Sequence, residues 1–209
     1  MKKKFSILLF MAVSFMTTYA QSEKDKYDVI NTYMSLLIKD TTKTIVVVKE
    51  KISPNTVIKL FTGGAEANFV YSKKNVVEDP DFGIQKPLFK WSDVNKMRNK
   101  YRDDANDGKY GFAKNANWSS KDFNLKNIYF EIFDSIMIKK EKALPIYKYK
   151  TLLIALSDPM YYRNRKYLVI GIAIQSTSPL INLNYYVIVM KKNKNKWEVV
   201  QKGEKYWVE

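Results

Sequence analysis

The sequence predicts a single α+β domain with an N-terminal helix, a mixed middle section and a C-terminal antiparallel β-meander. Apolar residues recur at helical spacing near the start, and four β-like runs follow one another near the end. No linker or internal repeat divides the 209 residues. A hydrophobic content of 46% is too high for a disordered protein, so we expect one ordered domain over residues 21–209.

The first twenty residues have the three parts of a secretory signal peptide. Met1 to Lys4 is positively charged, and Phe5 to Met16 is largely apolar. Thr18 and Ala20 occupy the small-residue positions that precede a cleavage site. The apolar run is shorter than the ~20 residues of a membrane span, although an uncleaved N-terminal anchor is the alternative. We therefore expect cleavage after Ala20 and a soluble product in the periplasm or outside the cell.

In the first half of the mature chain, spacing and turn residues indicate short elements. Ser22 to Lys39 has apolar residues three and four apart and predicts a helix. The β-branched run from Thr44 to Val48 predicts a strand. The further expectations are a strand or short helix over Thr56 to Phe61, a short strand over Ala67 to Tyr71, and a loop from Lys73 to Phe89.

The middle section combines a second helix with polar loops. Ser92 is predicted to cap a helix whose apolar face includes Val94 and Met97. The remaining expectations are a polar loop over Asp103 to Gly111, a helical turn over Trp118 to Phe123, and a strand or helix over Phe130 to Ile138.

The last third predicts the meander, because short turns join its β-like runs. Parallel strands would instead need helical crossovers between them. Trp197 and Val199 alternate with Glu198, which places Trp197 on the core-facing side of the last strand. The four predicted strands are Thr151 to Ala155, Tyr167 to Gln175, Asn184 to Lys191 and Lys196 to Gln201.

A set of aromatic, basic and turn residues is spread over the second half of the chain, between Leu88 and Trp207. Its members are Trp91, Tyr101, Trp118, Leu156 to Met160, Lys166, Tyr167, Tyr185 to Lys192, Lys196 to Val200 and Tyr206 to Val208. In these residues the chain resembles exported, functionally uncharacterised proteins of Bacteroidetes-type bacteria, and the most specific part of the similarity is the closing lysine-tryptophan hairpin. The resemblance implies export and this type of domain, but no activity.

Composition excludes several classes of enzyme and of metal site. The chain has no His, so the commonest general base and metal ligand is missing. It has no Cys, so it forms neither disulfides nor thiolate zinc sites. Any metal site would have to use oxygen ligands, and Asp103, Asp104 and Asp107 lack the calcium-loop spacing. We therefore expect no metal site and no cofactor.

The most visible chemistry is cationic. The net charge is +15, and loss of three lysines with the signal peptide leaves +12. Two turns combine basic residues with neighbouring aromatics, a composition that suits anionic or stacking ligands, although charged hairpin edges are the alternative. The candidate binding residues are Tyr161, Tyr162, Arg163, Arg165, Lys166, Lys191, Lys192, Lys194 and Lys196.

These patterns favour an exported, non-enzymatic binding domain for an anionic or carbohydrate envelope component or an envelope protein. Export argues against genomic nucleic acid as the partner. Two alternatives remain open, a carboxylate-dependent hydrolase using Glu131 and Asp134 and an immunity-type protein that covers another protein.

We predict that the mature N-terminus is Gln21, because the charged, apolar and small-residue regions occur in the order that signal peptidase requires. Intact-mass analysis of protein from the native host checks this. A purified product that still carries Met1 to Ala20 would contradict soluble export.

Overall fold

The computed structural model describes residues 23–38, 44–62, 77–79, 83–85, 90–125, 128–134, 151–176 and 184–204. The predicted signal peptide and the short strand predicted over Ala67 to Tyr71 lie outside the described residues.

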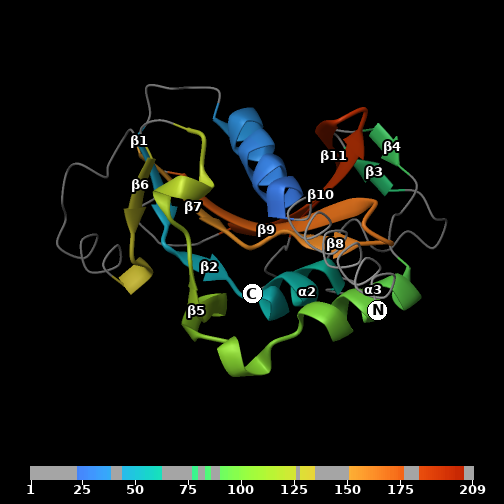
Figure 1. Ribbon diagram of the computed structural model, residues 1–209, viewed down its shortest axis with the longest axis horizontal. Coiled ribbons are helices and arrows are strands. Elements are labelled where there is room, and N and C mark those ends of the chain that lie inside the picture. The colour runs from blue at the N-terminus through green and yellow to red at the C-terminus, as the bar shows by residue number, and fades with distance from the viewer. Residues whose placement is uncertain are drawn as a thin grey trace, which may run out of the picture.

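A seven-stranded mixed sheet forms the centre of the molecule (Figure 1). Its order is β11-β10-β9-β7-β1-β6, and β8 pairs with β9 on the same side as β7. Strands β7 to β11 pair antiparallel, which confirms the predicted meander. Strand β1 pairs parallel to both β6 and β7, which the sequence did not indicate. The strands are β1 (Thr44–Val48), β6 (Ile128–Glu131), β7 (Thr151–Leu156), β8 (Met160–Tyr162), β9 (Tyr167–Ser176), β10 (Asn184–Asn193) and β11 (Lys196–Glu204).

Helices cover both faces of this sheet. The predicted N-terminal helix is confirmed over residues 23–37, and it lies across one face (Figure 1). Helices α2 (Pro54–Thr62) and α3 (Trp91–Tyr101) lie on the other face. Each face therefore has its own apolar core, because side chains alternate between the faces along every strand.

Smaller elements join the sheet to the helices. Strand β2 (Glu50–Ile52) pairs antiparallel with β5 (Phe112–Asn117), beside the main sheet. Three short 3-10 turns follow α3 and β5, and the last of them confirms the helical turn predicted within Trp118 to Phe123. These turns are η2 (Asp104–Asn106), η3 (Lys109–Gly111) and η4 (Ser120–Asp122).

Three local predictions need correction or completion. The segment Lys73 to Phe89 was expected to be loop, but β3 (Val77–Asp79) and β4 (Gly83–Gln85) pair there as a two-stranded ribbon. Ser92 does not cap α3, because the helix begins at Trp91 and Lys90 is its N-cap residue. The segment predicted over Thr56 to Phe61 is helical, as one of the two alternatives stated.

A glycine on β9 sets how closely α2 approaches the sheet. A Cβ atom at Gly171 would lie 2.5 Å from Cγ2 of Val57, which is closer than non-bonded carbon atoms approach each other. The Gly171 N–H also donates to Oγ of Ser157, at 2.9 Å. The missing side chain thus lets the buried face of α2 rest directly on β9.

Trp197 lies in the core, as its position in the alternating pattern predicts. Only 6% of its surface is exposed, and it belongs to the same apolar cluster as Tyr186, Ile188 and Met190 on β10. Its indole N–H finds no acceptor among the described residues, whereas that of Trp118 donates to the Leu156 carbonyl at 3.0 Å.

We expect Trp197→Ala to lower the free energy of unfolding by ~3–5 kcal/mol, because it empties a large buried volume. Trp197→Phe should cost much less, because it keeps an aromatic ring and removes an N–H that has no acceptor. Urea unfolding measures both changes, and an unchanged midpoint for Trp197→Ala would contradict its place in the core.

We expect Gly171→Ala to destabilise the domain by ~1–3 kcal/mol, because the added methyl group overpacks the contact with Val57. In a Val57→Ala background the same change should cost less, since the clashing methyl group is gone. The double-mutant cycle is measured by urea unfolding. Strict additivity would mean that α2 and β9 are not in the close contact described.

Candidate functional site

Strand register brings the two predicted basic turns to the same end of the sheet. Tyr162 and Tyr167 face each other at the last rung of β8 and β9, and Tyr167 is also opposite Lys191 on β10. The β8–β9 turn (163–166) and the hairpin end of β10 and β11 (191–196) therefore lie side by side. We call these two segments together the cationic end.

Left-handed backbone conformations shape both turns. Lys194 and Asn195 have φ values of 44° and 71°, as a two-residue hairpin turn requires. In the β8–β9 turn, Arg163, Asn164 and Arg165 all have positive φ, at 50°, 53° and 64°. Three consecutive non-glycine residues in this region are unusual, because the Cβ atom disfavours it.

The two tyrosines predicted to bind a ligand lie in the core instead. Tyr161 is 8% exposed and Tyr162 is 1% exposed, because β8 is covered on both of its faces. The Tyr162 ring packs edge-on against Phe61 at 5.0 Å, and its hydroxyl oxygen accepts a hydrogen bond from the Lys90 N–H. Burial also raises the pKa of Tyr162. Neither ring presents an open face on which a base or sugar could stack.

Two of the predicted cations are used within the protein. The Arg163 guanidinium lies 3.5 Å from the Asp93 carboxylate of α3. The Lys192 ammonium lies 2.6 Å from the carboxylate of Asp25 in the N-terminal helix, and 5.7 Å from the centre of the Trp197 ring. These two pairs hold a helix on each face of the sheet against the cationic end.

The other five predicted cations are exposed. Within the part of the chain that the structure describes, none of them has a carboxylate at ion-pair distance. Glu198 is the acid opposite Lys191 in the β10–β11 register, and its carboxylate accepts a hydrogen bond from Asn193. The five residues, named below the five free cations, are Arg165, Lys166, Lys191, Lys194 and Lys196.

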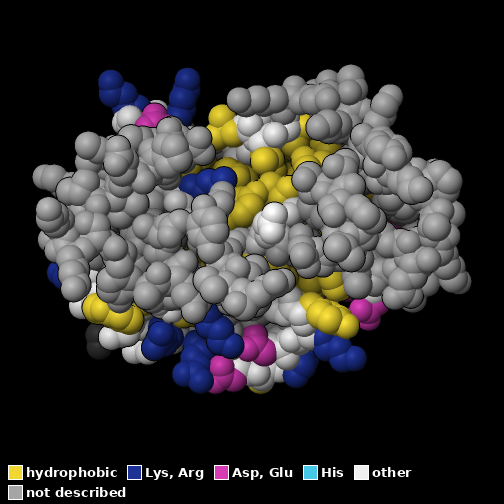
Figure 2. Space-filling view, turned by 180° about the vertical axis from the view of Figure 1, so that it is seen from behind, with side chains coloured by type: hydrophobic (Ala, Val, Ile, Leu, Met, Phe, Trp, Pro, Cys, Tyr) yellow, Lys and Arg dark blue, Asp and Glu magenta, His cyan; other side chains and the backbone are white. Residues whose placement is uncertain are grey.

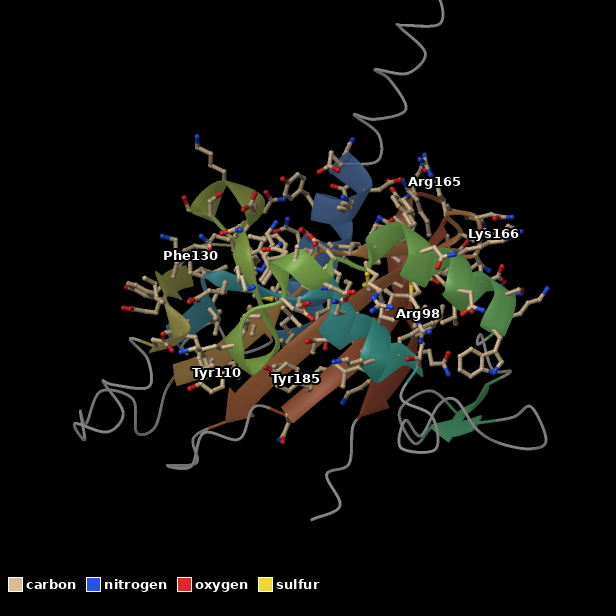
Figure 3. All side chains as sticks on the ribbon, turned by 90° about the horizontal axis from the view of Figure 1, so that it is seen from below. Arg98, Tyr110, Phe130, Arg165, Lys166 and Tyr185 are labelled. Carbon is tan, nitrogen blue, oxygen red and sulfur yellow. The ribbon has the colours of Figure 1, made fainter. Side chains whose placement is uncertain are left out.

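Lys100 at the end of α3 adds a cation that the sequence did not identify. Its ammonium lies 4.9 Å from the centre of the Tyr101 ring and 5.7 Å from that of Tyr161. In the view of Figure 3, Arg98 of the same helix lies on the same side of the molecule as Arg165 and Lys166, away from Tyr110 and Tyr185. A basic last turn is common in helices, so nothing in the local sequence distinguished Lys100.

The aspartate-rich loop after α3 has a structural role. Asp107 accepts hydrogen bonds from the Ser53 hydroxyl and, at 2.9 Å, from the Asn55 amide at the start of α2. Asp104 accepts from the same amide and from Arg102, and the hydrogen bond from Arg102 lowers the pKa of Asp104. In the described residues, no three Asp or Glu side chains come together to hold a metal ion.

The carboxylates proposed for the hydrolase alternative are not enclosed. Glu131 ends β6 and is half-buried, whereas Asp134 is exposed in the turn that follows. A glycosidase needs two carboxyl groups that flank one cleft, and the exposed position of Asp134 does not provide such an enclosure.

Charges of both signs occur on the face of the molecule seen in Figure 2. There, Lys and Arg side chains are interleaved with Asp and Glu along the lower border. At the cationic end, two acidic neighbours, Asp25 and Asp93, are already paired with Lys192 and Arg163, and Glu198 opposite Lys191 is the acid that is not in an ion pair among the described residues.

No protein-family model, no curated protein and no solved structure matches the chain. No helix within the described ranges is long and apolar enough to cross a membrane. Geometry and charge are therefore the basis for assigning a function.

Proposed function

We propose that this protein is an exported, non-enzymatic binding domain whose cationic end binds an anionic polymer of the cell envelope or its surroundings. The observation that carries the proposal is the strand register from Tyr162 through Tyr167 to Lys191, which gathers the five free cations at one end of the sheet. The N-terminal signal pattern supports export.

The charge arrangement favours a polymer over a small neutral ligand. Exposed cations attract a chain of negative charges, and each neutralised charge releases a counterion that contributes favourable entropy. Because Asp25 and Asp93 are already neutralised by Lys192 and Arg163, they oppose this attraction only weakly. The net positive charge of the whole chain acts in the same direction.

Burial of Tyr161, Tyr162 and Trp197 removes the stacking that the sequence suggested. Recognition of sugars or bases by aromatic faces would need exposed rings at the cationic end. The ligand is therefore selected by the density and spacing of its charges, and binding should weaken steeply as salt increases.

The alternative roles have less support. Asp134 is too exposed for the acid of a hydrolase. A protein-covering partner would need a continuous apolar patch. Among the described residues, the large exposed apolar side chains instead belong to separate segments, represented by Leu36, Trp91, Tyr110 and Tyr129.

We expect replacement of the five free cations by Gln to weaken binding to immobilised heparin, so that the variant elutes earlier in a salt gradient. The magnitude of the slope of log affinity against log salt should fall by roughly 3.5 to 4.5, as expected for the loss of about five counterions. Stability should change little, because exposed substitutions usually cost less than ~0.5 kcal/mol each.

A control variant with the same net charge replaces five exposed lysines elsewhere by Gln. This control should elute closer to the parent protein than the variant that lacks the five free cations does. If the control elutes as early as the test variant, heparin responds to overall charge and the cationic end is not a binding site. The control lysines are Lys49, Lys59, Lys109, Lys114 and Lys121.

A further inference from the structure

Two cations lie over one buried ring. The Arg165 guanidinium lies 5.4 Å from the centre of the Tyr161 ring, and the Lys100 ammonium lies 5.7 Å from the same centre. The two charges are therefore at most about 11 Å apart, the sum of these distances. Within the described residues, neither has a carboxylate at ion-pair distance. Like charges within this range repel each other, and an anion bound near both would relieve that repulsion.

The acids of the neighbouring elements do not supply that anion. On the N-terminal helix, Glu23 pairs with Lys26 at 3.0 Å and Asp25 pairs with Lys192 at 2.6 Å. Asp28, the third acid of that helix, makes no ion pair with Lys100 or Arg165 among the described residues. On α3, Asp93 pairs with Arg163. The positive charge of Lys100 and Arg165 is thus left for a group from outside the protein.

The backbone holds Arg165 in this place at a conformational cost. Arg165 is the last of the three consecutive residues with positive φ in the β8–β9 turn. Tyr161, beneath it, is fixed by burial and by a hydrogen bond from its N–H to the Tyr101 hydroxyl at 3.0 Å. Backbone strain of this kind persists where the surrounding structure enforces it, and it is concentrated at functional positions.

We infer that Lys100 and Arg165 form a subsite for one tetrahedral oxyanion, the phosphate or sulfate ester group of an anionic ligand. The planar fork of Arg165 can bind two oxygen atoms, and Lys100 adds a point charge on a mobile stem. The inference rests on the proposed function, because it assigns one charged group of the polymer to a defined position at the cationic end.

The first test follows thermal unfolding in inorganic phosphate, sulfate or chloride at equal ionic strength. Phosphate and sulfate stabilise most folded proteins by exclusion from the surface, so the subsite is measured as the part of the rise in melting temperature above chloride that requires Lys100 and Arg165, because a ligand of the folded state stabilises it further. Lys100→Gln and Arg165→Gln should each reduce the affinity for phosphate at least fivefold. Arg165→Lys should retain part of the effect, and the control Lys121→Gln should retain all of it.

Melting temperatures measured in chloride alone test whether Lys100 and Arg165 merely stabilise the fold. Removing either cation relieves repulsion, so Lys100→Gln and Arg165→Gln should unfold at the same temperature as the parent protein or higher. A lower melting temperature in chloride would show that the two cations stabilise the fold, and it would overturn the subsite.

Binding of a heparin tetrasaccharide separates the subsite from the proposed function. If phosphate and sulfate act no differently from chloride, the subsite is wrong, even when binding of the tetrasaccharide still depends on Lys191, Lys194 and Lys196. If phosphate binding requires Lys100 and Arg165 but the protein does not bind the tetrasaccharide, the subsite stands and the polymer-binding function fails.

Discussion

Burial of β9 on both faces is the constraint on which the rest of the structure depends. Leu168, Ile170 and Ile172 point to one face and Val169 and Ala173 to the other, and all five are fully buried. Such a strand is stable only if elements cover both faces. The N-terminal helix covers the first face, and α2 covers the second by resting on the glycine in the middle of the strand.

The same strand also determines where the charged groups lie. Tyr167 pairs with β8 on one side and with β10 on the other. The β8–β9 turn and the turn between β10 and β11 therefore lie beside each other at the same end of the sheet. Two cations from these turns pair with acids of the covering helices, so the packing that buries β9 also neutralises those acids. The five free cations are what remains after the fold has used its own ion pairs.

Local patterns predicted much of the fold and little of the site. The alternation around Trp197 was sufficient to predict its burial, and the helical spacing after Ser22 was sufficient to predict the N-terminal helix, because both patterns depend on neighbours in sequence. The parallel pairing of β1 with β6 depends on residues about eighty positions apart, which no local pattern encodes. Tyr161 and Tyr162 look like exposed turn aromatics in sequence, and only the packing of β8 beneath α3 and beside β9 reveals their burial. Lys100 was missed for the same reason, since Tyr161 is sixty residues away.

Burial of the aromatic rings changes what the cationic end can recognise. Cations lie near the rings of Tyr161, Tyr167 and Trp197, so their attraction to the ring faces orients side chains of the protein itself. An orienting ring restricts a long basic side chain, which reduces the entropy lost when that side chain binds an anion. Of the five free cations, Arg165 is the one that the described contacts place over such a ring. Under the proposed function, the aromatic residues therefore orient charge within the protein, and the ligand would contact ammonium and guanidinium groups.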